Sequence, residues 1–166
     1  EITTGDGNSA LGSMALQNGT TGSYNTAVGF RALDVNTRGG DNTALGAWSL
    51  FKSTEGVKNT AVGFGSLQAN TTGACHTGVG ACALISNTTG HCNFANCNTA
   101  VGYQSGYYGR TADYNTGVGF KSLYLTNGHS NTAIGASAGL GIVTGNKNTA
   151  LGASAGALVV KLQGDN

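Results

Sequence analysis

Asn25-Thr26-Ala27-Val28-Gly29 is the motif on which this sequence is built, because the chain repeats it along almost its whole length. Nine copies occur, and they start at residues 8, 25, 42, 59, 76, 98, 115, 131 and 148. Successive copies are 17, 17, 17, 17, 22, 17, 16 and 17 residues apart. A short fixed period over a whole chain is typical of stacked-repeat proteins, in which each repeat contacts its neighbours.

We number each repeat from its first residue as position 0, which is Asn in eight copies and His76 in the other. Position 1 is Thr or Ser, position 2 is Ala or Gly, and position 3 is Val, Leu or Ile. This pattern favours a short strand, which a glycine at position 4 ends where a bend requires positive φ or leaves no room for a Cβ atom. The position 4 turn glycines are Gly12, Gly29, Gly46, Gly63, Gly80, Gly102, Gly119, Gly135 and Gly152.

A second conserved pair within each repeat follows at positions 7 and 8. Position 7 is Ala or Ser, and position 8 is Leu in six copies and Gly in three. We expect this pair to form a second short strand, so that each repeat makes one rung of two strands and two turns. The predicted fold is therefore all-β, a parallel β-solenoid or β-roll of about nine 17-residue rungs. At a spacing of roughly 4.8 Å, such a stack is about 40 Å long.

The alternation of side chains along a strand separates positions 1 and 3 from positions 2 and 4. We expect the aliphatic residues of position 3 to point inward with the position 8 leucines. The Ala and Gly residues of positions 2 and 4 then form an outer face that a second copy can approach closely. Two aliphatic residues per rung make a thin core against an ordering cost of about 1–2 kcal/mol per residue, so we expect an intertwined or packed homo-oligomer.

The sequence contains one repeat domain, residues 1–166, with repeats from residue 8 to about residue 156. An irregular insertion is expected at 91–97, where five extra residues precede Asn98. The segment 157–163 leaves the pattern and is expected to form a terminal strand. The chain begins with Glu1 and not with Met, so we expect a processed chain or a fragment.

The composition excludes several classes of partner. Only 9% of the residues are charged and the net charge is +1, which does not suit nucleic acid or an anionic membrane surface. No apolar run approaches the roughly 18 residues of a membrane span, so we expect no membrane insertion. Abundant Thr, Asn, Ser and Gly favour an extracellular or virion-surface location.

The four cysteines cluster around the irregular insertion. Cys75 and Cys92 are 17 residues apart, and equivalent positions on stacked rungs would place their Cα atoms about 5 Å apart, within disulfide range. Cys82 and Cys97 form a second candidate pair. Free thiols and a zinc site are the alternatives.

The sequence shows no recognisable catalytic site, and we expect neither enzymatic activity nor a cofactor or metal. His76, His91 and His129 stand where other repeats have Asn, Gly or another turn residue, which predicts exposed turns. The seven carboxylates are scattered and form no recurrent pair for acid–base chemistry or calcium binding.

Tyrosines concentrate in the least repetitive part of the chain, residues 91–114. They are either rings that pack on the roll or a surface that stacks against sugars. The candidate surface-binding residues are Tyr103, Tyr107, Tyr108 and Tyr114.

The motif Asn-Thr-Ala-Val-Gly-x-x-Ala-Leu at 25–33, with Asn-Thr-Thr-Gly at 70–73, resembles the repeats of bacteriophage tail-fibre-type proteins. In that family such repeats often precede a self-cleaving chaperone domain. More distantly, the motif is similar to the short repeats in the heads of trimeric autotransporter adhesins, which form left-handed β-rolls. The resemblance covers residue 8 to about residue 156 and implies an elongated homotrimer on a virion or cell surface.

The sequence therefore predicts a structural protein: a fibre segment that self-associates into an elongated rod or a head-to-tail filament. The first alternative is an adhesin or tail-fibre domain that binds a host-surface glycan or receptor. The second is an ice-binding solenoid, because the position 1 threonines would form an evenly spaced row.

Overall fold

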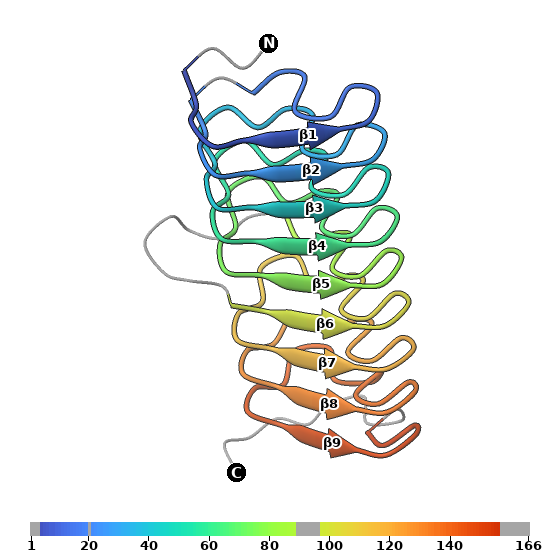
Figure 1. The fold of residues 1–166 in the computed structure, drawn as a ribbon. Coiled ribbons are helices and arrows are strands. Elements are labelled where there is room, and N and C mark those ends of the chain that lie inside the picture. The colour runs from blue at the N-terminus through green and yellow to red at the C-terminus, as the bar shows by residue number, and fades with distance from the viewer. Residues whose placement is uncertain (1–3, 20, 89–96, 157–166) are drawn as a thin grey trace.

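The computed structural model describes residues 4–19, 21–88 and 97–156. It contains nine short parallel strands, which stack in sequence order as one sheet along a rod (Figure 1). The described residues contain no helix, and the predicted all-β solenoid is confirmed. The strands are β1 (Ser9–Leu11), β2 (Thr26–Val28), β3 (Thr43–Leu45), β4 (Thr60–Val62), β5 (Thr77–Val79), β6 (Thr99–Val101), β7 (Thr116–Val118), β8 (Thr132–Ile134) and β9 (Thr149–Leu151).

Every strand pairs with the next in the same register. Thr43 lies opposite Thr60, and the pairing of Thr77 with Thr99 keeps this register across the 22-residue step. Residues 89–96 and 157–166, which hold most of the expected insertion and the expected terminal strand, lie outside the described part. Equivalent residues of successive repeats therefore form columns along the rod.

The expected second strand at positions 7 and 8 is wrong. Arg31 at position 6 and Leu33 at position 8 have φ of 56° and 51°, which is left-handed backbone and not strand. The turn is nevertheless bonded to the next rung, since the Leu33 N–H donates to the Ser49 carbonyl at 3.0 Å. Each rung is thus one three-residue strand followed by a tightly wound turn.

The position 4 glycines meet both predicted requirements. Gly46 has φ of +131°, and a Cβ atom placed on it would lie 2.7 Å from the carbonyl carbon of Gly63. Gly152 in the last described rung has φ of +113°, and a Cβ atom there would meet nothing within 4 Å. Backbone conformation therefore favours glycine at position 4 in both rungs. At Gly46, contact with the following rung also excludes a side chain.

The expected orientation of the strands is also wrong. The position 2 residues Ala27, Ala44 and Ala61 are fully buried, whereas Leu45 and Ile134 at position 3 are 37% and 44% exposed. Position 2 has little free space inside the roll, and a Cβ atom on Gly78 would lie 2.6 Å from the Ser66 hydroxyl. The Ala and Gly residues of position 2 form the interior, and the aliphatic residues of position 3 face outward.

The position 8 leucines fill the interior as expected, and the core is divided where they are missing. One buried cluster includes Leu33, Leu50 and Leu84, and a second begins at Leu123. Between them, Gly106 replaces leucine and helps to line a cavity of about 20 Å³. The missing leucine therefore leaves a small cavity at the rung that contains β6.

Candidate functional site

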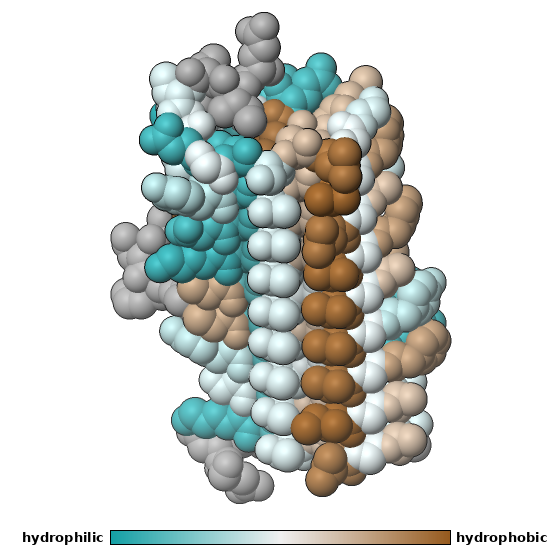
Figure 2. Space-filling view, in the orientation of Figure 1, coloured by the Kyte–Doolittle hydropathy of each residue, from teal (hydrophilic) through white to brown (hydrophobic). Residues whose placement is uncertain are grey.

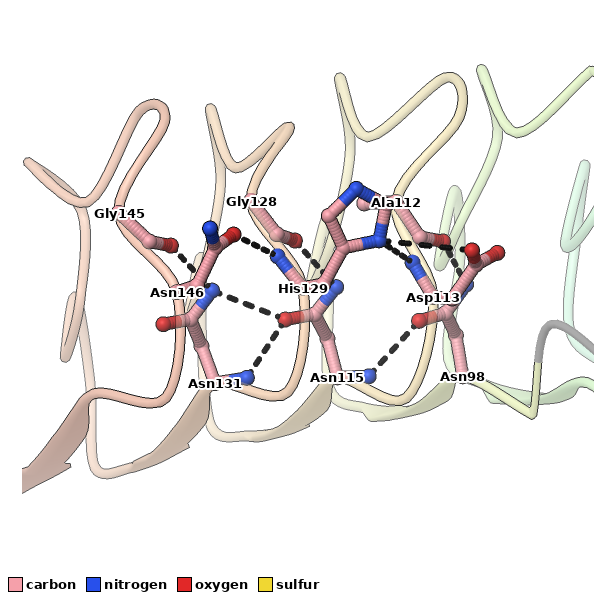
Figure 3. Close-up of polar contacts among 9 residues, drawn as sticks. All are labelled: Asn98, Ala112, Asp113, Asn115, Gly128, His129, Asn131, Gly145 and Asn146. Atoms are coloured by element: carbon pink, nitrogen blue, oxygen red, sulfur yellow. Dashed lines mark hydrogen bonds and ion pairs between the residues drawn. The ribbon is translucent and has the colours of Figure 1, made fainter. Parts of the chain in front are cut away.

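A column of buried asparagines at position 0 joins the rungs. The Asn42 N–H and its Nδ2 donate to Asn25 Oδ1 at 3.0 and 3.1 Å, and Nδ2 also donates to the Gly56 carbonyl at 2.7 Å. Figure 3 shows the same arrangement at Asn115 and Asn131. Sequence reasoning missed this column, although the near-invariance of position 0 was its signal. Each amide satisfies backbone groups in its own rung and the next, so the column is structural.

His76 continues this column at the one repeat that lacks Asn. It is fully buried, and its Nδ1 accepts the Asn98 N–H at 3.2 Å, so the neutral ring carries its proton on Nε2. Nε2 lies 3.0 Å from Asn87 Nδ2, which is itself a donor, and Asn87 Oδ1 is buried without a partner among the described residues. We therefore assign the Asn87 carboxamide in the flipped orientation, in which its oxygen accepts the Nε2 proton. Burial lowers the pKa of His76 to about 4. The prediction that His76 occupies an exposed turn is wrong, because a histidine ring can replace the hydrogen bonds of the Asn side chain.

The outward side of the sheet carries two parallel columns, which we call the Thr–aliphatic face. It consists of the Thr or Ser residues of position 1 and the Val, Leu or Ile residues of position 3. Figure 2 shows the aliphatic residues as one continuous hydrophobic column beside paler ones. The aliphatic column consists of Leu11, Val28, Leu45, Val62, Val79, Val101, Val118, Ile134 and Leu151.

Several aromatic rings form a second exposed feature, the aromatic cluster, on the turns that follow β6 and β7. It contains Tyr103, Tyr107, Tyr108, Phe120 and Tyr124. The Tyr103 and Phe120 rings stack with centroids 5.6 Å apart, as do those of Tyr107 and Tyr124 at 5.2 Å. Each of these two pairs joins equivalent positions of consecutive rungs. The in-register stacking that builds the sheet therefore also assembles the rings.

Lys121 and two further rings, Phe120 and Tyr124, join the tyrosines that were named from the sequence. Lys121 Nζ lies 5.3 Å from the ring centroids of both Phe120 and Tyr124, in the range of cation–π attraction. Partial burial, followed by the neighbouring Tyr108 and Tyr107, raises the pKa of Tyr124. Tyr114 is exposed, and no ring contact among the described residues joins it to the cluster. The expected tyrosine set is therefore brought together at Tyr103, Tyr107 and Tyr108, without Tyr114.

The cysteines have a different register from the one expected. Because Thr77 pairs with Thr99, Cys97 and not Cys92 occupies the position equivalent to Cys75. The Cys97 N–H donates to the Ala74 carbonyl at 3.3 Å, and burial followed by the neighbouring Cys75 thiol raises the pKa of Cys97. Cys75, Cys82 and Cys97 are free thiols, and Cys92 lies outside the described residues.

In the last three repeats, polar side chains lie beside the asparagine column, two residues before each Asn (Figure 3). The His129 N–H donates to Asn146 Oδ1 at 2.8 Å, and the Asp113 N–H donates to His129 Nδ1 at 3.1 Å. His129 is on the surface as expected, whereas His91 lies outside the described residues. In the described ranges, no group of three His, Cys, Asp or Glu side chains is arranged to hold a metal ion.

No family model, curated protein or solved structure matches this chain. No helix in the described ranges is long and apolar enough to cross a membrane. Arguments about function therefore rest on three features of the chain itself: the asparagine column, the Thr–aliphatic face and the aromatic cluster.

Proposed function

We propose that this chain is a structural segment of an extracellular or virion-surface fibre that self-associates into an elongated rod or filament. The observation that carries this proposal is the in-register stack of nine rungs joined by the buried asparagine column. Such a stack transmits one geometry along its length, and each added rung repeats the contacts of the previous one. The absence of charge from the strands also suits close association of copies.

The two end strands support growth by stacking. Within the described residues, β1 pairs only with β2 and β9 pairs only with β8. In every rung before that of β9, the N–H at position 1 donates to the carbonyl of the position 0 residue in the following rung. The Thr132 N–H, for example, donates to the Asn148 carbonyl at 2.8 Å. Thr149 can donate in the same way to Asn8 of a second copy. Unpaired strand edges of this kind favour pairing with another chain.

Electron microscopy of the purified chain over a range of concentrations tests this function. We expect elongated particles, several times longer than the roughly 40 Å of one nine-rung stack. Sedimentation velocity in the same samples should give a mass above that of one 16.5 kDa chain. Particles that keep the length and the mass of a single chain at every concentration would contradict the proposal.

A second candidate function is glycan binding by an adhesin or tail-fibre domain, and the aromatic cluster favours it. Tyr108 and Phe120 are 44% and 50% exposed, so their apolar ring surfaces remain available to a ligand. Phenol hydroxyls and Lys121 lie beside these rings and could hydrogen-bond to a sugar.

A glycan array distinguishes the second function from the first. Binding should be lost in the double variant Tyr108→Ala/Phe120→Ala and retained in Phe64→Ala, which removes a ring that is 58% exposed and lies outside the cluster. A chain that binds no glycan on the array, or that binds equally well without Tyr108 and Phe120, would dismiss this candidate.

A further inference from the structure

We propose that the Thr–aliphatic face docks side by side against the same face of a second copy of this chain. This inference rests on the proposed fibre function and names the surface through which copies associate laterally. It replaces the expectation that the Ala and Gly residues of positions 2 and 4 form that surface, because position 2 is buried inside each rung.

The first argument is the chemistry of the face. All nine strands consist of Thr, Ser, Ala, Gly, Val, Leu and Ile, so the face carries no ionisable side chain along its whole length. Leu45 of β3 and Ile134 of β8 are exposed although each of these strands is paired on both sides. A parallel sheet normally has both of its faces covered, and a continuous exposed apolar surface marks an interaction site.

The second argument is the regular spacing of the face. The register of the strands repeats each threonine and each aliphatic side chain once per rung, including across the step from β5 to β6. Two copies have the same period, so contacts that fit at one rung fit at the others. The strand backbones already bond to adjacent strands, and the copies can therefore pack through side chains alone, as in two-sheet packing.

The third argument is the area of the face. With roughly 4.8 Å per rung and about 3.3 Å per strand residue, nine three-residue strands give a face of about 43 by 10 Å. Two such faces would bury about 860 Å² in total, which approaches the roughly 1,000 Å² of a specific interface. Phe30 and Phe64 at position 5 follow the aliphatic residue of the face by two positions in the sequence. Their rings are exposed and can widen the contact.

A second copy fits these features better than another class of partner. Nucleic acid and anionic lipid headgroups require positive charge, which the strands do not have. A partner with a different repeat would lose alignment over nine rungs, whereas an identical chain keeps it. Ice is the remaining surface with a regular lattice, and we treat it as an outcome of the test.

The test uses two matched pairs of substitutions in the full chain. Val62→Glu with Val101→Glu places two charges in the aliphatic column. Val57→Glu with Val143→Glu places the same charges at valines that are 37% and 38% exposed outside the strands. Far-UV circular dichroism checks that each variant is folded. Val62→Thr with Val101→Thr, which keeps the shape of the valines, serves as a milder variant if the Glu pair fails to fold.

Sedimentation velocity measures association, and electron microscopy measures particle width. We expect the wild-type chain and the Val57/Val143 variant to associate side by side. The Val62/Val101 Glu variant should raise the dissociation constant at least tenfold and give narrower particles, and the Thr variant should raise it less.

Three results would overturn the inference, and they differ in what they imply for the fibre function. Elongated particles whose width and affinity are unchanged by charges at Val62 and Val101 would reject the face alone. A wild-type chain that stays monomeric at every concentration would reject both the face and the fibre function. A monomer that inhibits the growth of ice crystals, and loses this activity in the Val62/Val101 variant, would assign the face to ice.

Discussion

The two sides of the sheet differ in what they contain and in what they tolerate. On the inner side, position 2 never exceeds alanine in size, and position 0 is an amide or, once, a histidine. On the outer side, position 3 varies among Val, Leu and Ile, and its residues are exposed or half-buried. Neighbouring residues of one three-residue strand therefore serve different purposes. The inner side fixes the register and the width of the roll, and the outer side is free to serve assembly.

The largest expected effect is on the inner side, at the asparagine column. Asn42→Ala removes the acceptor of the Asn59 N–H and the donor to the Gly56 carbonyl, and leaves both backbone groups buried without a partner. We expect the free energy of unfolding to fall by about 4 kcal/mol, since each such group costs about 1–3 kcal/mol. Chemical denaturation followed by circular dichroism measures this loss.

A surface asparagine provides the control for the column. Asn127 is exposed, and among the described residues its side chain accepts only the Arg110 N–H, at 3.3 Å. Asn127→Ala should therefore cost less than about 1 kcal/mol. Equal losses of stability in Asn42→Ala and Asn127→Ala would show that the buried column does not hold the rungs together.

A smaller effect, which depends on pH, is expected at His76. Its pKa of about 4 in the folded chain lies below the unfolded value of 6.5, so the unfolded state binds more protons in between. The stabilisation from the neutral ring is complete above pH 6.5 and is lost as the pH falls to about 4, by about 3 kcal/mol.

His76→Asn tests this because it introduces the residue that the other repeats carry at position 0. Denaturation curves between pH 7 and pH 4 should show a steep loss of stability for the wild-type chain and a much smaller one for the variant. Identical pH profiles would mean that His76 is not buried in the column.

The smallest expected effect is a difference in stability between substitutions at two neighbouring positions of β4. Ala61→Leu enlarges a fully buried residue and should cost about 2 kcal/mol through overpacking. Val62→Leu introduces the residue that β3 already carries at the equivalent outward position, Leu45. It should change the free energy of unfolding by less than about 0.5 kcal/mol. Thermal melts of the two variants measure this difference. A greater loss in Val62→Leu than in Ala61→Leu would reverse the assigned orientation of the strands.

The sequence was sufficient to predict the solenoid, the stacking of equivalent residues and the roles of the position 4 glycines. All of these depend on spacing, which a repeat displays directly. Which side of the strand faces inward could not be read from alternation, because a period of two defines two faces without orienting them. Hydrophobicity favoured Val28 as the inner residue, but the narrow interior accepts only Ala27.

The asparagine column and the cysteine register were missed for separate reasons. A buried amide is unexpected until its partners are known, and Asn42 satisfies three hydrogen bonds only in the stacked geometry. Cys75 and Cys92 are separated by one repeat length, but the motif at Asn98 resumes the register and aligns Cys97 with Cys75. In both cases, three-dimensional contacts decide between alternatives that the spacing leaves open.

Solid-state NMR of the isotope-labelled chain tests the central claim most directly, because it works on monomers and on assembled fibres alike. In-register stacking predicts a correlation between Asn42 Nδ2 and the Asn25 carboxamide carbon, and close contact between the α-carbons of Gly46 and Gly63. Helical chemical shifts for the strand residues, or the absence of both contacts in a folded sample, would contradict the account.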